Sequence, residues 1–170
     1  NWTDRGMRYS EKAGRTSVEA GMEKLSIVTQ IWTGDWDGSW TERYHIQSLA
    51  AALDMKLLRN IREESSGTYS IGVYPVMETE PVSSYRIAVQ FTCDPDRVDE
   101  LTDKVKSEID AFRRTLPDEK FAHDVTESQQ RSLSENLKRN NWWLAQMGFA
   151  VESDIDPESM MNRRALYDSL

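Results

Sequence analysis

One stretch of this sequence constrains the fold more than any other: a long amphipathic helix that leads through a short turn into a β-strand. The helix is predicted from Ser39 to about residue 63, because one apolar stripe recurs at three- and four-residue steps. The stripe consists of Ile46, Leu49, Ala50, Leu53, Leu57 and Ile61. A strand that opens at Tyr69 follows, with Ile71 and Val73 on the same face.

The two ends of this helix carry recognisable signals. Ser39 is the expected N-cap and Glu42 the N3 residue of a capping box. Arg62 lies in the last turn, where a cation suits the helix dipole, and Gly67 lies where a chain leaving a helix often needs positive φ. This succession of helix, turn and strand can hold the Arg62 cation and the Tyr69 hydroxyl close to each other. From spacing alone, a surface Arg and a half-buried Tyr on an ordinary helix–turn–strand remains the favoured interpretation.

Alternating patterns predict further strands. Residues 16–20 are expected to form a short strand, and residues 25–33 a strand with both faces at least partly covered. Residues 84–92 alternate as well and follow the loop at 78–83, so they are predicted to pair with the strand from residue 69 as an antiparallel hairpin.

Helices are predicted for the rest of the chain. Asp94 as N-cap and Pro95 at N1 begin one that ends near residue 116. It is expected to bury Val98, Leu101, Val105, Ile109 and Phe112. Residues 117–119 begin a polar surface helix, which the segment around residues 142–147 continues or follows as a short helix ended by Gly148. Residues 156–158 begin a last helix.

Strand hairpins followed by helices predict an α+β two-layer sandwich, mostly antiparallel, with helices packed on one face of the sheet. The length of 170 residues suits one domain, with residues 1–15 as a linker or tail and residues 16–170 as the domain. The net charge of -8 argues against nonspecific nucleic-acid binding. No apolar run approaches the length of a membrane span. A lone Cys93 excludes an internal disulfide and is expected to be a small buried residue.

Residues 62–70, which read Arg-Glu-x-x-x-Gly-x-Tyr-Ser, resemble the C-terminal-half signature of the insulinase/pitrilysin family of zinc peptidases, the inverted zincins. Residues 21–26 are similar to the Gly-x-Glu-x-x-Ser entry of that family, and residues 91–95 to its strand-to-helix junction. The resemblance covers roughly residues 16–150. It implies a fold of the LuxS/metallohydrolase-like type that continues beyond Leu170. We therefore expect an excised piece, truncated at its C-terminal end.

The resemblance also implies a divided active site. In the family, one half carries zinc, water and general base, and the homologous half supplies an Arg and a Tyr. By position these are Arg62, which would bind substrate, and Tyr69, which would stabilise the oxyanion. The zinc-bearing domain would lie in the same chain or in a partner subunit, with a peptide as substrate, and the resemblance weakly favours a periplasmic or otherwise exported protein. The alternative is a non-catalytic structural or interaction subunit, which the intact Arg-to-Tyr motif disfavours.

The chain has no His-x-x-Glu-His motif of its own. His123 and Glu127 are one helical turn apart and could share a metal, but exposed helix residues explain them and His45 better. We predict that this chain alone binds no zinc and is inactive. Five tryptophans are expected to form a cluster: Trp32, Trp36, Trp40, Trp142 and Trp143. Core packing is the favoured interpretation, and a docking surface for other domains is the alternative.

Overall fold

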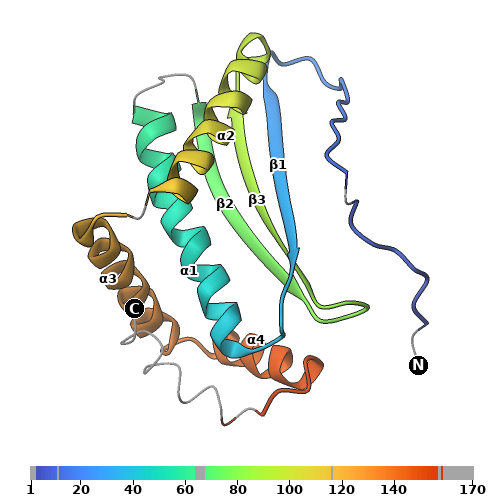
Figure 1. Cartoon of the computed structure of the whole chain (residues 1–170), viewed down its shortest axis with the longest axis vertical. Coiled ribbons are helices and arrows are strands. Elements are labelled where there is room, and N and C mark those ends of the chain that lie inside the picture. Colours follow the sequence, from blue (N-terminus) through green and yellow to red (C-terminus); the bar gives the residue numbers. More distant parts are fainter. Residues whose placement is uncertain (1–2, 11, 64–67, 116, 157, 159–170) are drawn as a thin grey trace.

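The computed structural model of the chain describes residues 3–10, 12–63, 68–115, 117–156 and 158, of which residues 62, 63, 68 and 69 are described by their backbone only. Figure 1 shows the elements in their order along the chain. They are β1 (Ser26–Asp35), α1 (Trp40–Leu57), the π-helix η1 (Leu58–Glu63), β2 (Thr68–Glu78), β3 (Ser84–Cys93), the 3-10 turn η2 (Pro95–Arg97), α2 (Val98–Arg114), α3 (Glu119–Asn136) and α4 (Asn140–Glu152).

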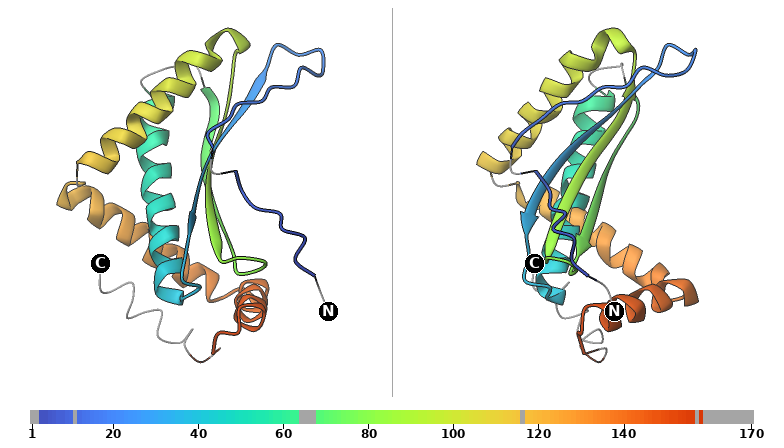
Figure 2. Two further views of the ribbon diagram at one scale, coloured as in Figure 1. Left: turned by 45° about the vertical axis from the view of Figure 1, so that its right-hand side comes forward. Right: turned by 90° about the vertical axis from the view of Figure 1, so that its right-hand side faces the viewer.

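The described strands form one three-stranded antiparallel sheet in the order β1-β3-β2. The hairpin β2–β3 is the one predicted, and β1 joins it on the far side of β3. Helices α1 and α2 lie on one face of the sheet, whereas the N-terminal segment runs past the opposite face (Figures 1 and 2). The predicted α+β two-layer sandwich is therefore confirmed.

The main core lies between this sheet and the helices α1 and α2. Strand β3 supplies the inward-facing Val89, Phe91 and Cys93, all fully buried. They meet side chains from α1, η1 and α2, namely Leu53, Leu57, Ile61, Leu101, Val105 and Ile109. Each such side chain contributes about 1.5–3 kcal/mol through burial. The predicted burial of Cys93 is confirmed, and it raises the pKa of the thiol.

A second cluster joins the loop after β1 to α4. Trp36 and Trp40 are buried, and the indole Nε1–H of Trp36 donates to the Glu78 carbonyl at 2.8 Å. The Phe149 ring of α4 lies 5.2 Å from Trp40, centroid to centroid, and the Arg43 guanidinium lies 3.6 Å from the Phe149 centroid. This supports core packing for Trp36 and Trp40. The remaining tryptophans of the predicted cluster are half-buried: Trp32, Trp142 and Trp143.

Several expectations about the strands are wrong. Residues 16–20 form no strand, and their side chains are exposed, because no neighbouring strand pairs with them. Strand β1 is covered on one face only: Ile27 is 67% exposed and Ile31 55% exposed on the face opposite the helices. Alternation alone could not reveal this, because β-branched residues suit either face of a strand.

Three helix predictions also need correction. Leu49 was expected in the buried stripe of α1 but is 42% exposed, since it lies at the edge of that stripe. Gly148 lies inside α4 and does not end it, because the following Phe149 and Ala150 anchor the helix. The helix expected from Asp156 falls largely outside the described residues. In the described part of the chain, no helix has the length and apolarity needed to cross a bilayer.

The start of α1 departs slightly from a capping box. The Ser39 hydroxyl accepts from the Glu42 N–H at 3.1 Å, which confirms the N-cap. The Glu42 carboxylate, however, accepts from the Asp37 N–H, while the Ser39 N–H donates to the Asp37 carboxylate at 2.7 Å. The loop before α1 thus folds back on the helix. Three hydrogen bonds among Asp37, Ser39 and Glu42 replace the two reciprocal bonds of a capping box.

Candidate functional site

The connection from α1 to β2 contains both predicted site residues. Arg62 lies in η1, so the last helical turn expected for it is a π-helical one. Leu57 and Ile61 are fully buried on either side of this change and hold η1 against the sheet. A π-helical segment interrupts the normal i→i−4 ladder and is often found at functional sites. Gly67, which was expected to have positive φ, falls outside the described residues.

Tyr69 occupies an irregular position in β2. Thr68 is paired with Cys93 and Ser70 with Thr92, the immediately adjacent residue of β3. Tyr69 is therefore the extra residue of a β-bulge at the start of the strand. A bulge bends the strand and redirects the side chains next to it. The sequence placed Tyr69 at the strand start, but it gave no sign of the bulge.

A hydrogen bond fixes α1 against β2 below these two residues. The Asp54 carboxylate accepts from the Val73 N–H at 2.9 Å. From this bond the chain rises through α1 and η1 to Arg62, eight residues away, or about 12 Å at the usual helical rise. Tyr69 lies four residues from Val73 in β2, or about 13 Å at the usual strand rise.

These two lengths bring the backbones of Arg62 and Tyr69 to about the same level. Helix α1 ends and strand β2 begins at the same end of the molecule (Figure 1), and η1 contacts β2 directly. A cation and a phenol can therefore be carried on two neighbouring elements, each anchored in the core.

A second polar contact holds η1 to the other helix of the layer. The Asn60 amide Nδ2 donates to the Glu108 carboxylate of α2 at 2.6 Å, in a partly buried setting. A hydrogen bond to a charged acceptor is stronger than one between neutral groups. The segment that carries Arg62 is thus tied to β2 through α1 and to α2 through Asn60.

Two of the hollows in the described surface lie near opposite ends of α1. One of about 610 Å³ opens beside the end of α1, between the ends of α2 and α3. Its lining includes three cations, two carboxylates and two aromatic rings: Lys56, Arg59, Lys120, Asp118, Asp124, Phe112 and Phe121. The other, of about 590 Å³, lies at the opposite end of α1 and carries four carboxylates, those of Asp37, Glu80, Glu152 and Asp154.

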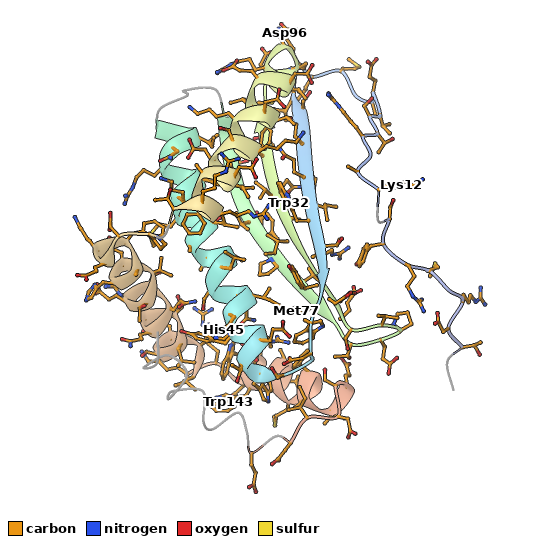
Figure 3. All side chains as sticks on the ribbon, in the orientation of Figure 1. Lys12, Trp32, His45, Met77, Asp96 and Trp143 are labelled. Carbon is orange, nitrogen blue, oxygen red and sulfur yellow. The ribbon has the colours of Figure 1, made fainter. Side chains whose placement is uncertain are left out.

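His45 and His123 lie on different helices, α1 and α3. His45 is exposed near the start of α1, at the end away from η1 (Figure 3), and His123 is exposed on α3. Glu127, one turn from His123, pairs instead with Arg131 at 3.0 Å. Among the residues that the structure describes, no three His, Cys, Asp or Glu side chains are grouped so as to hold a metal ion. The described residues of this chain therefore do not fit a zinc site.

Sequence reasoning missed Asp54 altogether. It lies beside Leu53 on α1, and a polar residue next to an apolar stripe is ordinary in a surface helix. The hydrogen bond that its carboxylate accepts from the Val73 N–H is visible only in the folded chain.

Comparison with known proteins places this geometry in context. The family described as "Peptidase M16 inactive domain" matches residues 2–126. Among solved structures, the periplasmic protease PqqL of Escherichia coli superposes with a TM-score of 0.73 at 21% identity, over 87% of this chain and 16% of that chain. A mutant of the ferredoxin protease FusC, in complex with Arabidopsis ferredoxin, gives 0.68 at 16% identity, over 88% and 16% of the two chains.

A predicted insulinase family protease from Yersinia pestis gives a TM-score of 0.59 at 15% identity, over 86% of this chain and 34% of that chain. At these identities the likeness concerns the fold. The chain spans about one sixth of the length of PqqL and of FusC. No curated protein sequence matches this chain.

Proposed function

From the premise that this chain belongs to the M16 peptidase family, as its inactive-type domain, we propose that it is one domain of a longer insulinase-type zinc metallopeptidase. In this proposal it contributes groups to an active site whose zinc lies in another domain. The observation that carries the proposal is that α1 with η1 and the antiparallel β2 bring the backbones of Arg62 and Tyr69 to one end of the molecule.

The proposed role of Tyr69 follows from the charge that peptide hydrolysis creates. Attack on a peptide carbonyl builds negative charge on its oxygen, whichever group activates the water. A hydroxyl held in place donates a hydrogen bond to that oxygen and stabilises the tetrahedral state, which is worth about 2.7–4 kcal/mol for one such donor. The bulge in β2 supports this role, because it holds Tyr69 in a fixed, non-repeating position in an anchored strand.

Arg62 is proposed to bind the substrate backbone. A guanidinium presents several N–H donors in a fixed plane, so it can hold a substrate carbonyl in register for the reaction. The Asn60–Glu108 contact and the buried Ile61 support this role, because both restrain the segment in which Arg62 lies. In this proposal the activated water comes from the zinc-bearing domain, in the same chain or in a partner subunit.

PqqL is described as a periplasmic protease, and a periplasmic or otherwise exported location is proposed for this protein on that likeness. Fractionation of expressing cells, with detection of this chain in the periplasmic or the cytoplasmic fraction, tests it directly.

The first experiment is peptidase activity of the longer protein on a mixed pool of unstructured peptides, with and without a zinc chelator. Tyr69→Phe removes one hydroxyl, and we expect kcat to fall roughly a hundredfold or more while KM changes little. Tyr74→Phe is the matched control: it lies in the same strand, is 55% exposed, and should leave kcat unchanged.

Two results would contradict the proposal. An unchanged kcat in Tyr69→Phe would remove Tyr69 from the active site. No cleavage under any condition, by a folded protein that binds no zinc, would favour the alternative of a non-catalytic structural or interaction subunit, with Arg62 and Tyr69 as parts of a helix end and a strand.

A further inference from the structure

Helix α1 and the outer edge of β2 are joined by a hydrogen bond in addition to their apolar packing. Asp54 is partly buried on α1, and its carboxylate accepts from the Val73 N–H at 2.9 Å. Because the other edge of β2 pairs with β3, this N–H belongs to the strand edge that has no strand beside it in the described sheet. A partly buried carboxylate is costly unless it is hydrogen-bonded, so the bond accounts for the presence of Asp54 on this face.

Apolar contacts alone would not set the level of the strand. Ile71 and Val73 are partly buried and pack against the main core, but burial of apolar surface is non-directional. The Asp54 bond is directional and joins one atom of α1 to one residue of β2. It can therefore specify which residues of the two elements lie at the same level.

We infer that Asp54 is a positioning residue, which fixes β2 against α1 and thereby places Tyr69 level with Arg62. This inference rests on the proposed function. Tyr69 is the bulged residue of β2, four positions before Val73. A shift of β2 against α1 would move the backbone of Tyr69 relative to that of Arg62, and the Asp54 bond opposes such a shift together with the β3 ladder and the buried face of β2.

The test uses the longer protein with both of its halves. We expect Asp54→Ala to lower kcat by roughly ten- to a hundredfold, the cost of misplacing a reacting group by about 1 Å, with little change in KM. Asp54→Asn keeps an oxygen that accepts from the Val73 N–H, so it should retain kcat within about threefold. If Asp54→Ala does not accumulate as folded protein, Asp54→Ser replaces it, because its hydroxyl is polar but too short to reach Val73.

A matched control separates positioning from general loosening of α1. The Ser48 hydroxyl accepts from the Gln129 amide at 2.8 Å and ties α1 to α3, away from β2. Ser48→Ala removes a bond of similar length from the same helix and should leave kcat unchanged. Amide hydrogen exchange of the intact protein should show faster exchange at Val73 in Asp54→Ala, and unaltered exchange there in Asp54→Asn and Ser48→Ala.

The double variant Asp54→Ala with Tyr69→Phe decides whether Asp54 acts through Tyr69. If it does, Asp54→Ala lowers kcat little further once the hydroxyl is gone, so the two effects are not additive. Additive losses, equal losses in Asp54→Ala and Asp54→Asn, equal losses in Asp54→Ala and Ser48→Ala, or normal kcat in Asp54→Ala would each overturn the inference. An active-site role for Tyr69 fails separately, if Tyr69→Phe by itself leaves kcat unchanged.

Discussion

Asp94 stabilises the connection between strand β3 and helix α2 through contacts of its side chain. Its carboxylate accepts from the Asp96 N–H at 2.9 Å, as the N-cap of η2, and lies 3.2 Å from the Lys24 ammonium. Lys24 also contacts Asp96 at 2.8 Å, at the end of the molecule where Asp96 is labelled in Figure 3. The predicted cap at Asp94 and Pro95 is confirmed, although it begins a 3-10 turn that leads into α2.

Asp94 gives a pH dependence of known sign. The Asp96 N–H, followed by Lys24, lowers the pKa of Asp94 below its ordinary value of 3.8. A carboxyl whose pKa is lower in the folded state contributes stability above pH 3.8, and this contribution is lost as the pH falls through the lowered pKa. We expect Asp94→Asn to lose less stability than the unaltered chain between pH 5 and pH 2, about the range of the titration.

Urea unfolding across this pH range measures the effect. Asp103→Asn, which removes an exposed carboxylate 4.0 Å from the Lys106 ammonium, is the control and should follow the unaltered chain. The explanation fails if Asp94→Asn shows the same acid-side slope as the unaltered chain.

At the scale of elements, the outer edge of β2 offers few N–H groups to another strand along its middle. The Val73 N–H is taken by Asp54, and alternate residues of a strand direct their N–H groups to the same edge. Pro75, two residues on, has no N–H to offer at that edge. An exposed strand edge invites pairing with other strands, so these two residues limit strand addition along the middle of β2.

The attachment of η1 to α2 is a second element-scale feature. Asn60→Ala removes the donor to Glu108, and we expect a loss of about 1–2 kcal/mol of unfolding free energy, because the bond is charge-assisted and partly buried. Chemical denaturation measures it. The double variant with Glu108→Ala should lose less than the sum of the single losses. Additive losses would mean that the two side chains do not stabilise the fold through each other.

At the scale of the whole molecule, the chain is a scaffold that presents its proposed site at one end. Its buried residues fill the space between sheet and helices, whereas Ile27, Ile31 and Tyr74 are more than half exposed on the other face of the sheet. The described titratable groups include no cluster that could bind a metal.

The proposed division of the active site predicts the behaviour of the chain by itself. We expect the 170-residue chain to bind less than stoichiometric zinc and to cleave none of the peptide pool, because neither His45 nor His123 has the partners of a zinc site among the described residues. Elemental analysis after dialysis measures the first, and the peptide assay the second. One tightly bound zinc per chain would show that residues outside the described part complete a site.

The local features of the fold were predictable because neighbouring residues cause them. The apolar stripe of α1, the N-caps at Ser39 and Asp94, and the hairpin of β2 and β3 follow from side-chain periodicity and capping chemistry. The positions of Arg62 and Tyr69 next to a helix end and a strand start follow for the same reason. Where periodicity was read without its surroundings, as at Leu49 and Ile27, the predicted burial was wrong.

The sequence by itself therefore determined the elements, their order, most buried positions and the family resemblance, because short-range chemistry encodes them. Tertiary structure alone decided that β1 pairs with β3, that the π-helix η1 follows α1, and that Tyr69 is a bulged residue. It also brought Asp54 to Val73 across nineteen residues and Asn60 to Glu108 across forty-eight. Such contacts depend on how helices and strands pack against each other, and a local sequence pattern carries no information on that packing.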